Sequence, residues 1–309
     1  MTGPSRPWLV AAFAVLCLIW GSTWAVIRVG LEGLPPFSGV SLRFAIASAL
    51  LLVLTWSSGV RLGRSALERR LWVVNGILSF AVSYGVVYWA EQWVPSGLTA
   101  VLFATYPLFV AVVAHFLLPA ERLTRLEGLG ILAGFVGVGV IFSEDLSALG
   151  GPAVALAAAV LLISPFVSAV SSVAIKRWGG GIHPFSLTTV PMAIGAAATG
   201  LVALATERGR PFVWSGASVA ALVYLAIAGS AVTFTLYYWL LSHMPAKRLA
   251  LITYIIPVEA VLIGTALGER LTARVVAGSG LVVLGVALAV HRPAGAGTAE
   301  VDAREAAGG

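Results

Sequence analysis

The sequence contains few charged residues and almost no cysteine. Asp, Glu, Lys and Arg make up 10% of the 309 residues, whereas hydrophobic residues make up 59% and the mean hydropathy is +0.98. So few polar side chains cannot cover the surface of a soluble globule. The only cysteine, Cys17, excludes an intrachain disulfide, and because it lies in an apolar run we interpret it as a small packing residue. The composition therefore predicts a polytopic membrane protein.

The sequence also lacks the motifs that enzymes use. It contains no HExxH, no paired cysteines and no GxSxG, and its four histidines are scattered, at His115, His183, His243 and His291. The glycines between 128 and 139 do not follow a strand, so they do not indicate a nucleotide-binding fingerprint. The net charge of +6 comes from Lys and Arg in short loops, which argues against a nucleic-acid partner. We therefore expect no enzymatic activity, no cofactor and no bound metal.

Ten apolar windows have the length of roughly 20 residues that a helix needs to cross about 30 Å of hydrocarbon. They fall at 8–30, 36–58, 71–93, 96–118, 124–143, 151–175, 184–206, 217–243, 246–267 and 273–291. The first window is longer than the apolar core of a cleaved signal peptide and contains Arg28, so we interpret it as a membrane span. Ten spans place both termini on the same side of the membrane.

The distribution of Lys and Arg predicts which side that is. If the N-terminus is cytoplasmic, thirteen of the nineteen basic residues lie in or beside cytoplasmic segments: Arg6, Arg61, Arg64, Arg69, Arg70, Arg122, Arg125, Lys176, Arg177, Lys247, Arg248, Arg292 and Arg304. Four lie outside, namely Arg208, Arg210, Arg270 and Arg274, while Arg28 and Arg43 lie near or within the bilayer. This asymmetry predicts a cytoplasmic N-terminus and a cytoplasmic C-terminus.

A long stretch of the sequence occurs twice. Tyr84–Pro107 aligns with Phe234–Pro257 at an offset of 150 positions, and Arg28–Ser38 aligns with Lys176–Ser186 at an offset of 148. Because five spans per copy is an odd number, the second copy crosses the membrane in the opposite sense. We therefore predict an all-α polytopic membrane fold of ten transmembrane helices in two inverted five-helix repeats, with a binding site between the repeats near mid-bilayer.

The predicted boundaries follow from this repeat. The first repeat covers 1–147, the second covers 148–292, and the polar, Ala- and Gly-rich segment 293–309 is predicted to be a disordered cytoplasmic tail. Glycines recur in the fifth and tenth windows at spacings that let two helices approach closely. They are Gly128, Gly130, Gly134, Gly137 and Gly139 in the fifth, and Gly278, Gly280 and Gly285 in the tenth.

Two prolines occupy matching positions in the repeated stretch. Pro107 and Pro257 lie inside the fourth and ninth windows, and a proline there offers no N–H to the carbonyl four residues earlier, that of Phe103 or Thr253. Within a membrane that carbonyl needs another partner, so the prolines mark a gate beside a cavity or a kink that only shapes packing. Four nearby residues with hydroxyls are candidate cavity residues: Thr105, Tyr106, Thr253 and Tyr254.

Three segments resemble a known family. They are Ile19–Phe44 (IWGSTWAVIRVGLEGLPPFSGVSLRF), 90–109 (AEQWVPSGLTAVLFATYPLF) and 264–272 (GTALGERLT), which are similar to the EamA family of the drug/metabolite transporter superfamily, over about residues 8–291. The resemblance is greatest to bacterial inner-membrane exporters. It implies ten helices, a central cavity formed by spans 1, 3, 4, 6, 8 and 9, and a location in the bacterial inner membrane. It names no substrate, because members handle amino acids, sugars, nucleobase-like compounds and toxic organic molecules.

Two predicted helices each carry a face of aromatic and polar side chains. In the first window two tryptophans recur every four residues with Arg28 on the same face, and in the third window two tyrosines and a glutamate share one face. Aromatic walls with a few polar groups suit amphipathic metabolites, although the alternative is aromatic packing at the lipid interface. We predict that these side chains line the cavity: Trp20, Ser22, Trp24, Tyr84, Tyr88, Glu91 and Tyr238.

Two charged residues lie inside predicted spans. Glu259 is about midway through the ninth window, with only apolar residues three and four positions away. A carboxylate at this depth is costly, so Glu259 is either a protonated acid bonded within the bundle or a cavity group that binds a substrate cation or carries a coupled proton. The family resemblance assigns it no role, because the motif usually has an apolar residue there. Arg43, nearer the extracellular third of the second window, is expected to face a partner or to snorkel.

These observations favour a secondary active transporter. We predict an exporter of small metabolites, amino acids or drug-like compounds that works by alternating access through a central cavity between the repeats. Metabolite uptake is the alternative direction, and a non-transporting membrane scaffold or receptor is the alternative class. The expected partners are a small-molecule substrate and the lipid bilayer, with proton coupling left open. The pattern does not distinguish a monomer from a homodimer.

Overall fold

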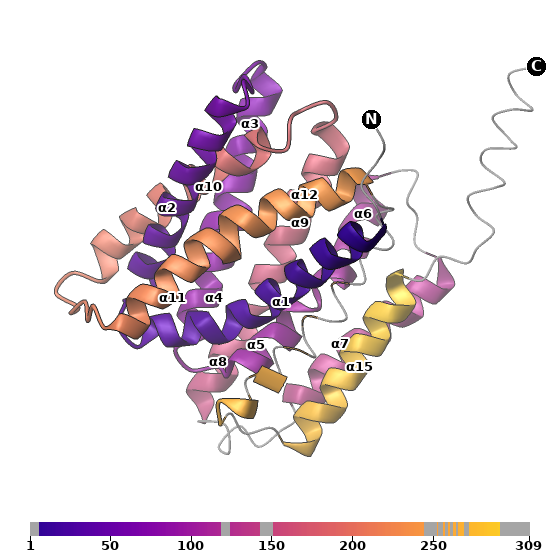
Figure 1. Cartoon of the computed structure of the whole chain (residues 1–309). Helices are drawn as coiled ribbons and strands as arrows, with labels where there is room; N and C mark the ends of the chain where they lie inside the picture. Colours follow the sequence, from indigo (N-terminus) through magenta and orange to yellow (C-terminus); the bar gives the residue numbers. More distant parts are fainter. Residues whose placement is uncertain are drawn as a thin grey trace, which may run out of the picture.

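The described residues of the computed structural model form helices and no strand. They are residues 6–118, 124–142, 151–243 and 272–290, together with 252, 256, 259, 262–263 and 265–268. The long helices lie side by side in one bundle (Figure 1). The all-α prediction is therefore confirmed over the part of the chain that the structure describes.

The helices of the first half follow one another with short connections. They are α1 (Arg6–Leu31), α2 (Pro36–Ser57), α3 (Ala66–Asn75), η1 (Gly76–Ser83), α4 (Tyr84–Ala90), α5 (Ser96–Phe103), α6 (Tyr106–Leu117) and α7 (Arg125–Phe142). α3, η1 and α4 form one continuous span, in which η1 is a π-helix.

The second half repeats this order. Its helices are α8 (Pro152–Leu161), α9 (Ile163–Trp178), α10 (Ser186–Thr206), α11 (Gly216–Ala226), η3 (Ile227–Val232), α12 (Thr233–His243) and α15 (Ala273–Val290). α11, η3 and α12 run on as one helical stretch, in which η3 is a π-helix.

Seven helical stretches in the described residues are long and apolar enough to cross a membrane. They are Pro7–Leu31, Pro36–Ser57, Ala66–Ala90, Ser96–Leu117, Pro152–Trp178, Ser186–Thr206 and Gly216–Tyr237. Each overlaps one of the predicted windows. α7 and α15 lie over two more, and the predicted window at 246–267 falls largely outside the described residues.

Proline and serine begin several of these helices. Pro36 and Pro152 occupy the first turns of α2 and α8, where the missing N–H removes no helical hydrogen bond. Ser65 and Ser215 precede α3 and α11, and their hydroxyl oxygens accept the backbone N–H three residues later, at 3.0 and 3.1 Å. The sequence thus sets these helix starts locally.

Carboxylates hold the N-terminal turns of α2 and α10. Glu207 accepts the backbone N–H groups of Phe37 and Ser38, both at 2.8 Å, and the hydroxyl of Ser38 at 2.6 Å. The hydroxyl of Ser186, the repeat counterpart of Ser38, donates to Glu68 at the start of α3. Because negative charge is stabilised at a helix N-terminus, each glutamate secures the start of a neighbouring span.

Hydroxyl groups then join α2 to α10 along their length. Ser41 donates to the carbonyl of Ala196 at 2.8 Å, and Ser48 donates to the carbonyl of Thr189 at 3.0 Å. The hydroxyls of Thr55 and Thr189 are 3.2 Å apart. Hydrogen bonds between helices and small side chains at the contact are what stabilise helix pairs in lipid. This pair joins the two halves of the chain.

α7 and α15 pack closely through glycine, as Figure 1 shows for the two helices side by side. A Cβ atom at Gly137 would lie 2.6 Å from the carbonyl oxygen of Gly278, and one at Gly285 would lie 2.7 Å from the Cα atom of Gly134. Nothing lies within 4 Å of a Cβ atom placed at Gly280. The two glycine-rich helices therefore approach closely, as predicted. Gly137 and Gly285 lie at the contact, whereas Gly280 does not.

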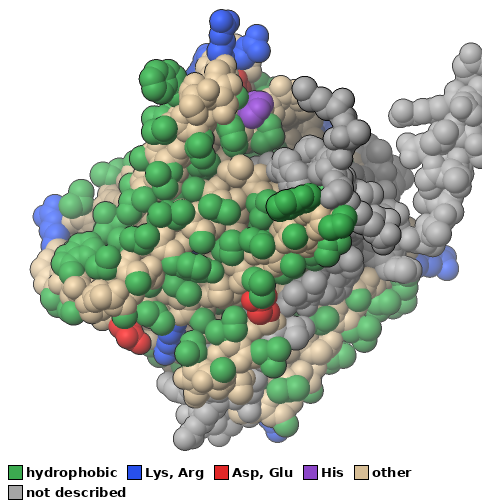
Figure 2. Space-filling model, in the orientation of Figure 1, with side chains coloured by type: hydrophobic (Ala, Val, Ile, Leu, Met, Phe, Trp, Pro, Cys, Tyr) green, Lys and Arg blue, Asp and Glu red, His purple; other side chains and the backbone are tan. Residues whose placement is uncertain are grey.

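Large apolar side chains cover the outside of the bundle. Trp56 is 83% exposed and Phe116 is 77% exposed, and leucines such as Leu201 and Leu204 are also exposed. Figure 2 shows hydrophobic side chains spread over one face of the bundle, with most Lys and Arg side chains at its edges. An apolar surface of this extent suits contact with lipid.

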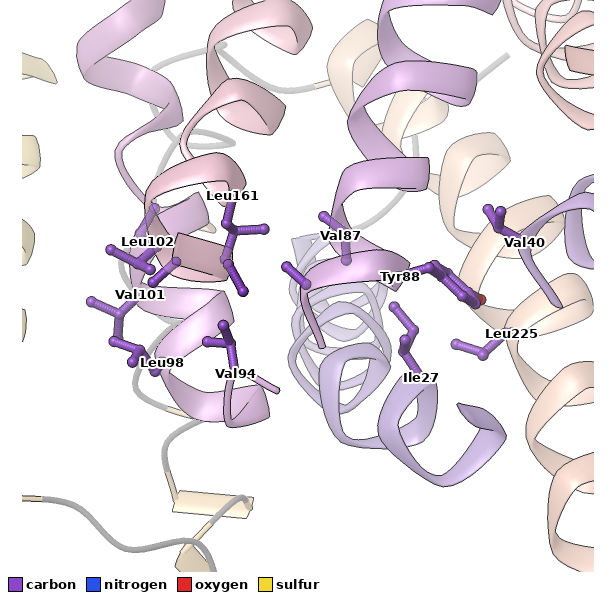
Figure 3. Packing of buried hydrophobic residues seen from close by; sticks show 14 of the residues in the cluster. Ile27, Val40, Val87, Tyr88, Val94, Leu98, Val101, Leu102, Leu161 and Leu225 are labelled. Atoms are coloured by element: carbon purple, nitrogen blue, oxygen red, sulfur yellow. The ribbon is translucent and has the colours of Figure 1, made fainter. Parts of the chain in front are cut away.

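The main core lies where the first half meets α8 and α11. Figure 3 shows Tyr88 pointing from α4 toward Val40, Ile27 and Leu225, which belong to α2, α1 and α11. The same view shows Leu98, Val101 and Leu102 of α5 beside Leu161 of α8, all of which belong to this cluster of buried residues. Because lipid is as apolar as these side chains, close packing rather than removal from water stabilises them.

Candidate functional site

The third and eighth spans share the same backbone irregularity. η1 and η3 are both π-helical, and at the repeat offset of 150 positions residues 77–82 of η1 correspond to residues 227–232 of η3. η1 ends directly before Tyr84, where the first copy of the repeated stretch begins, and η3 ends two residues before Phe234, where the second copy begins. π-helical turns are rare and are frequent at functional sites. The two halves of the chain thus carry a π-helix at corresponding positions of spans 3 and 8.

A group of aromatic rings, which we call the aromatic cluster, connects the first span to η1 and to α12, the helix that follows η3. Trp20 of α1 packs edge-on against Phe234 of α12 with ring centroids 5.8 Å apart, and Phe234 lies 5.6 Å from Phe80 of η1. Phe80 stacks with Tyr84 at 6.3 Å, and Phe44 of α2 is edge-on to Tyr84 at 4.9 Å. The aromatic cluster therefore contains residues of both repeats.

Trp24 extends this arrangement by one helical turn. Its ring lies 5.2 Å from that of Phe103, which stacks with Tyr106 at 6.1 Å. The indole Nε1 atoms of Trp20 and Trp24 are buried and have no hydrogen-bond partner among the described residues. A buried N–H group without an acceptor is costly, above all in a membrane interior. Both indoles can therefore donate to a bound molecule.

Arg43 lies at the centre of the polar part of this region. Its guanidinium Nε donates to the hydroxyl of Ser230 at 2.9 Å, its Nη2 donates to the carbonyl of Gly229 at 3.1 Å, and its Nη1 donates to the hydroxyl of Tyr88 at 3.4 Å. The side chain is fully buried. Arg43 therefore faces partners on spans 3 and 8 and does not snorkel.

Arg28 lies on the same face of α1 as Trp20 and Trp24, but it binds the turn that follows α4. Its Nη1 donates to the backbone carbonyls of Glu91 and Val94, at 2.8 and 3.1 Å. A cation at the end of a helix satisfies the last carbonyls and interacts favourably with the helix dipole. Arg28 thus stabilises the turn after α4, beside which the carboxyl-bearing residue Glu91 is itself buried.

Glu259 lies against α1. A Cβ atom at Gly21 would lie 2.9 Å from the Cγ atom of Glu259 and closer still to its carboxyl group. Only glycine leaves room for the carboxyl group at this position of α1. The Glu259 side chain is half-buried, and Gly21 comes directly after Trp20 of the aromatic cluster. The carboxyl group therefore approaches the same helix that supplies the two tryptophans.

The fourth span is interrupted before Pro107, as predicted. α5 ends at Phe103 and α6 begins at Tyr106, with a turn between them. The buried hydroxyl of Thr105 donates to the carbonyl of Leu102 at 2.6 Å, rather than to that of Phe103. The helix is thus broken beside the proline, and the hydroxyl of Thr105 bonds within its own turn.

Two other candidate residues bind neighbouring spans. The hydroxyls of Ser22 and Tyr224 are 2.7 Å apart, so Ser22 faces α11. The hydroxyl of Tyr106 donates to Ser172 of α9 at 2.7 Å. Each of these hydrogen bonds joins the first repeat to the second. Thr253, Tyr254, Pro257 and the side chain of Tyr238 lie outside the described residues.

The sequence analysis missed several residues of this region. Phe44, Phe80, Gly229 and Ser230 were not among the candidate residues, although the first two belong to the aromatic cluster and the last two bind Arg43. An arginine inside an apolar window was the available signal, because such a residue requires partners. Which residues those partners are depends on how spans 2 and 8 pack.

The fold and this site define a polytopic α-helical membrane protein whose halves meet at a buried polar and aromatic site. Residues 7–143 and 155–291 each match the model of the EamA-like transporter family. The chain belongs to this family, and the predicted internal duplication is confirmed by the two matches. A small-molecule substrate and membrane lipid are the partners that membership implies.

Curated relatives match most of the chain. One, named as the uncharacterized inner membrane transporter YedA of Escherichia coli (strain K12), is 30% identical over 279 residues, which cover 86% of this chain and 85% of that protein. An uncharacterized transporter of Archaeoglobus fulgidus is 29% identical over 290 residues, covering 93% and 99% of the two chains. A solved crystal structure covers 92% of this chain and 98% of its own with a TM-score of 0.64 and 22% identity, which shows a shared fold.

Proposed function

We propose that the chain is a secondary active transporter that exports a small metabolite, amino acid or drug-like compound by alternating access. The observation that carries the proposal is the aromatic cluster, which joins Trp20 of the first repeat to Phe234 of the second. The indole N–H groups of Trp20 and Trp24, which have no acceptor in the described part of the chain, add donors for a substrate. A substrate bound here contacts both repeats, as alternating access requires.

The pairing of the helices supports an inverted ten-helix architecture. α2 packs against α10 and α7 packs against α15, so that spans 2 and 7 and spans 5 and 10 each contact their own counterparts. The π-helices η1 and η3 occupy corresponding positions. We take 1–147 and 148–292 as the two repeats and 293–309 as the cytoplasmic tail. A pseudo-two-fold axis in the membrane plane accounts for both observations.

Transport is tested with the purified full chain in proteoliposomes. Efflux of candidate metabolites is measured with and without an imposed pH gradient, and protein-free liposomes are the control. We expect flux that the gradient accelerates, in the direction of export. Gradient-driven accumulation in the opposite direction would favour an uptake permease, and no flux for any compound that the protein binds would favour a scaffold or receptor.

The proposed orientation is tested by labelling single cysteines in a Cys17→Ser background. A cysteine at Ser147 is expected to react with an impermeant reagent from outside the cell, whereas a cysteine at Ala66 is not, because the loops rich in Lys and Arg stay in the cytoplasm. Labelling in permeabilised cells is the control for reactivity at Ala66. The reverse pattern would contradict a cytoplasmic N-terminus and C-terminus.

A further inference from the structure

Arg43 is a positive charge buried where four spans meet. The side chain comes from α2 and is fully buried. It contacts Tyr88 of α4 and Gly229 and Ser230 of η3. A Cβ atom at Gly229 would lie 3.4 Å from both Nη2 of Arg43 and Oγ1 of Thr23, so α1 also borders the guanidinium group. The guanidinium group also contacts the rings of Phe44 and Tyr84 of the aromatic cluster, which places Arg43 beside the proposed transport site.

All the groups that bind Arg43 are neutral. Its hydrogen-bond acceptors are two hydroxyls and one backbone carbonyl. The ring of Tyr84 lies 5.0 Å from the guanidinium carbon and that of Phe44 lies 5.4 Å from it, so both rings attract the cation through their π faces. No carboxylate among the described residues lies within ion-pair distance of Arg43. Within the described part of the chain, the guanidinium charge is therefore solvated by neutral groups and is not neutralised by a carboxylate.

Two guanidinium N–H groups of Arg43 have no acceptor among the described residues and are available to a ligand. A guanidinium has five N–H groups, and the three hydrogen bonds of Arg43 use three of them. Arginine typically binds a carboxylate through two parallel N–H groups, and such charge-assisted bonds are stronger than neutral ones. Charged residues inside membrane spans mark substrate or ion pathways.

The neighbouring donors point to the same chemistry. The indole N–H groups of Trp20 and Trp24 are also without acceptors among the described residues. The rings around them are apolar. A site that offers a cation and spare N–H groups within aromatic walls is complementary to a molecule with an anionic group on an apolar body.

We infer that Arg43 binds the anionic group of the transported molecule and that the substrate class is apolar or aromatic carboxylates. The inference rests on the proposed transport function and names the substrate class of that same site. Because Arg43 is covered here, the carboxylate reaches it when η3 moves away from α2. That movement exposes the two remaining guanidinium N–H groups and exchanges the bonds to Gly229 and Ser230 for bonds to the carboxylate.

Binding of three probes of nearly equal shape tests the charge selectivity. Phenylacetate is anionic, phenylacetamide is neutral and phenethylamine is cationic, and their binding to the purified full chain in nanodiscs is measured by equilibrium dialysis. We expect phenylacetate to bind about tenfold more tightly than phenylacetamide, the difference that one charge-assisted hydrogen bond supplies. Arg43→Gln should remove this preference while the Kd for phenylacetamide changes less than about twofold. Arg28→Gln, at the other arginine inside the first two spans, should keep the preference.

Two outcomes would overturn the inference. One is equal binding of phenylacetate and phenylacetamide, or tighter binding of phenethylamine, by the unaltered protein. The other is an anion preference that survives in a folded Arg43→Gln variant. If phenylacetate binds through Arg43 but shows no gradient-driven flux in proteoliposomes, the binding inference stands and the transport function fails, so the two failures are distinguishable.

A second experiment tests whether a water-soluble anion can reach Arg43. It uses a conservative variant and does not require Arg43→Gln to fold. Ser230→Cys in a Cys17→Ser background keeps a small side chain beside the guanidinium group. We expect a small, water-soluble anionic methanethiosulfonate to label this cysteine in membranes, and phenylacetate to slow the labelling. A cysteine that stays unlabelled while one at Ser147 reacts fully would show that Arg43 is permanently enclosed, which would overturn the inference.

Discussion

Replacing Gly285 by valine is expected to destabilise the protein severely. A Cβ atom at this position would lie 2.7 Å from the Cα atom of Gly134 and closer still to other backbone atoms of α7. Backbone cannot rotate out of the way as a side chain can, so α15 must separate from α7 along their whole contact. Overpacking of a well-packed contact costs about 1–3 kcal/mol, and the loss of helix contact adds to it.

The same helix provides the control for this result. Gly280→Val places its side chain where nothing lies within 4 Å, so it should leave the melting temperature nearly unchanged. The measurement is the thermal midpoint and the yield of monodisperse protein in size-exclusion chromatography for both variants. Equal midpoints for the two variants would mean that α7 and α15 do not pack as described.

Glu259→Gln is expected to abolish pH-driven flux or to shift its pH dependence while the protein stays folded. Glutamine keeps the shape of the side chain but cannot carry a proton or a negative charge. Glu259 is half-buried beside Gly21 of α1, on the helix that supplies Trp20 and Trp24. A carboxyl group within a membrane span is a proton carrier or a binding group for a substrate cation, and both roles require titration or charge.

Glycine variants of α1 test the position of this carboxyl group. Gly21→Ala places a methyl group on the carboxyl group of Glu259 and should reduce flux, whereas Gly30→Ala meets only the Cβ atom of Ala221 at 3.7 Å and should not. Unchanged flux and an unchanged pH profile in folded Glu259→Gln would contradict the proposed role.

Particular residues show how far sequence reasoning reached into the site. The spacing of Trp20 and Trp24 placed both on one face of the first helix, and the structure brings their rings against residues of other spans. Pro107 marked the break between α5 and α6, because a proline removes a backbone donor wherever it stands. Ser22 was predicted as a cavity residue beside these tryptophans, and the structure places its hydroxyl 2.7 Å from that of Tyr224.

The sequence could not predict which residues surround Arg43 and Glu259, for a physical reason. The apolar windows indicate that each charged side chain needs polar groups around it. Those groups come from other helices, at large separations along the chain. Ser230 lies 187 positions after Arg43. Such contacts depend on helix rotation and crossing, which in lipid are decided by detailed packing rather than by a hydrophobic pattern.

The sequence by itself determined that this protein is a membrane-embedded helical bundle built from a duplicated unit. Spanning lipid requires every backbone group to be bonded within its own helix, so long apolar windows specify helices without reference to tertiary contacts. Only the tertiary structure decided which faces of the helices meet. It brought Phe80 of η1 against Phe234 of α12 in the aromatic cluster and enclosed Arg43 with neutral partners among the described residues, because close approach of side chains from distant spans sets the environment of each charge.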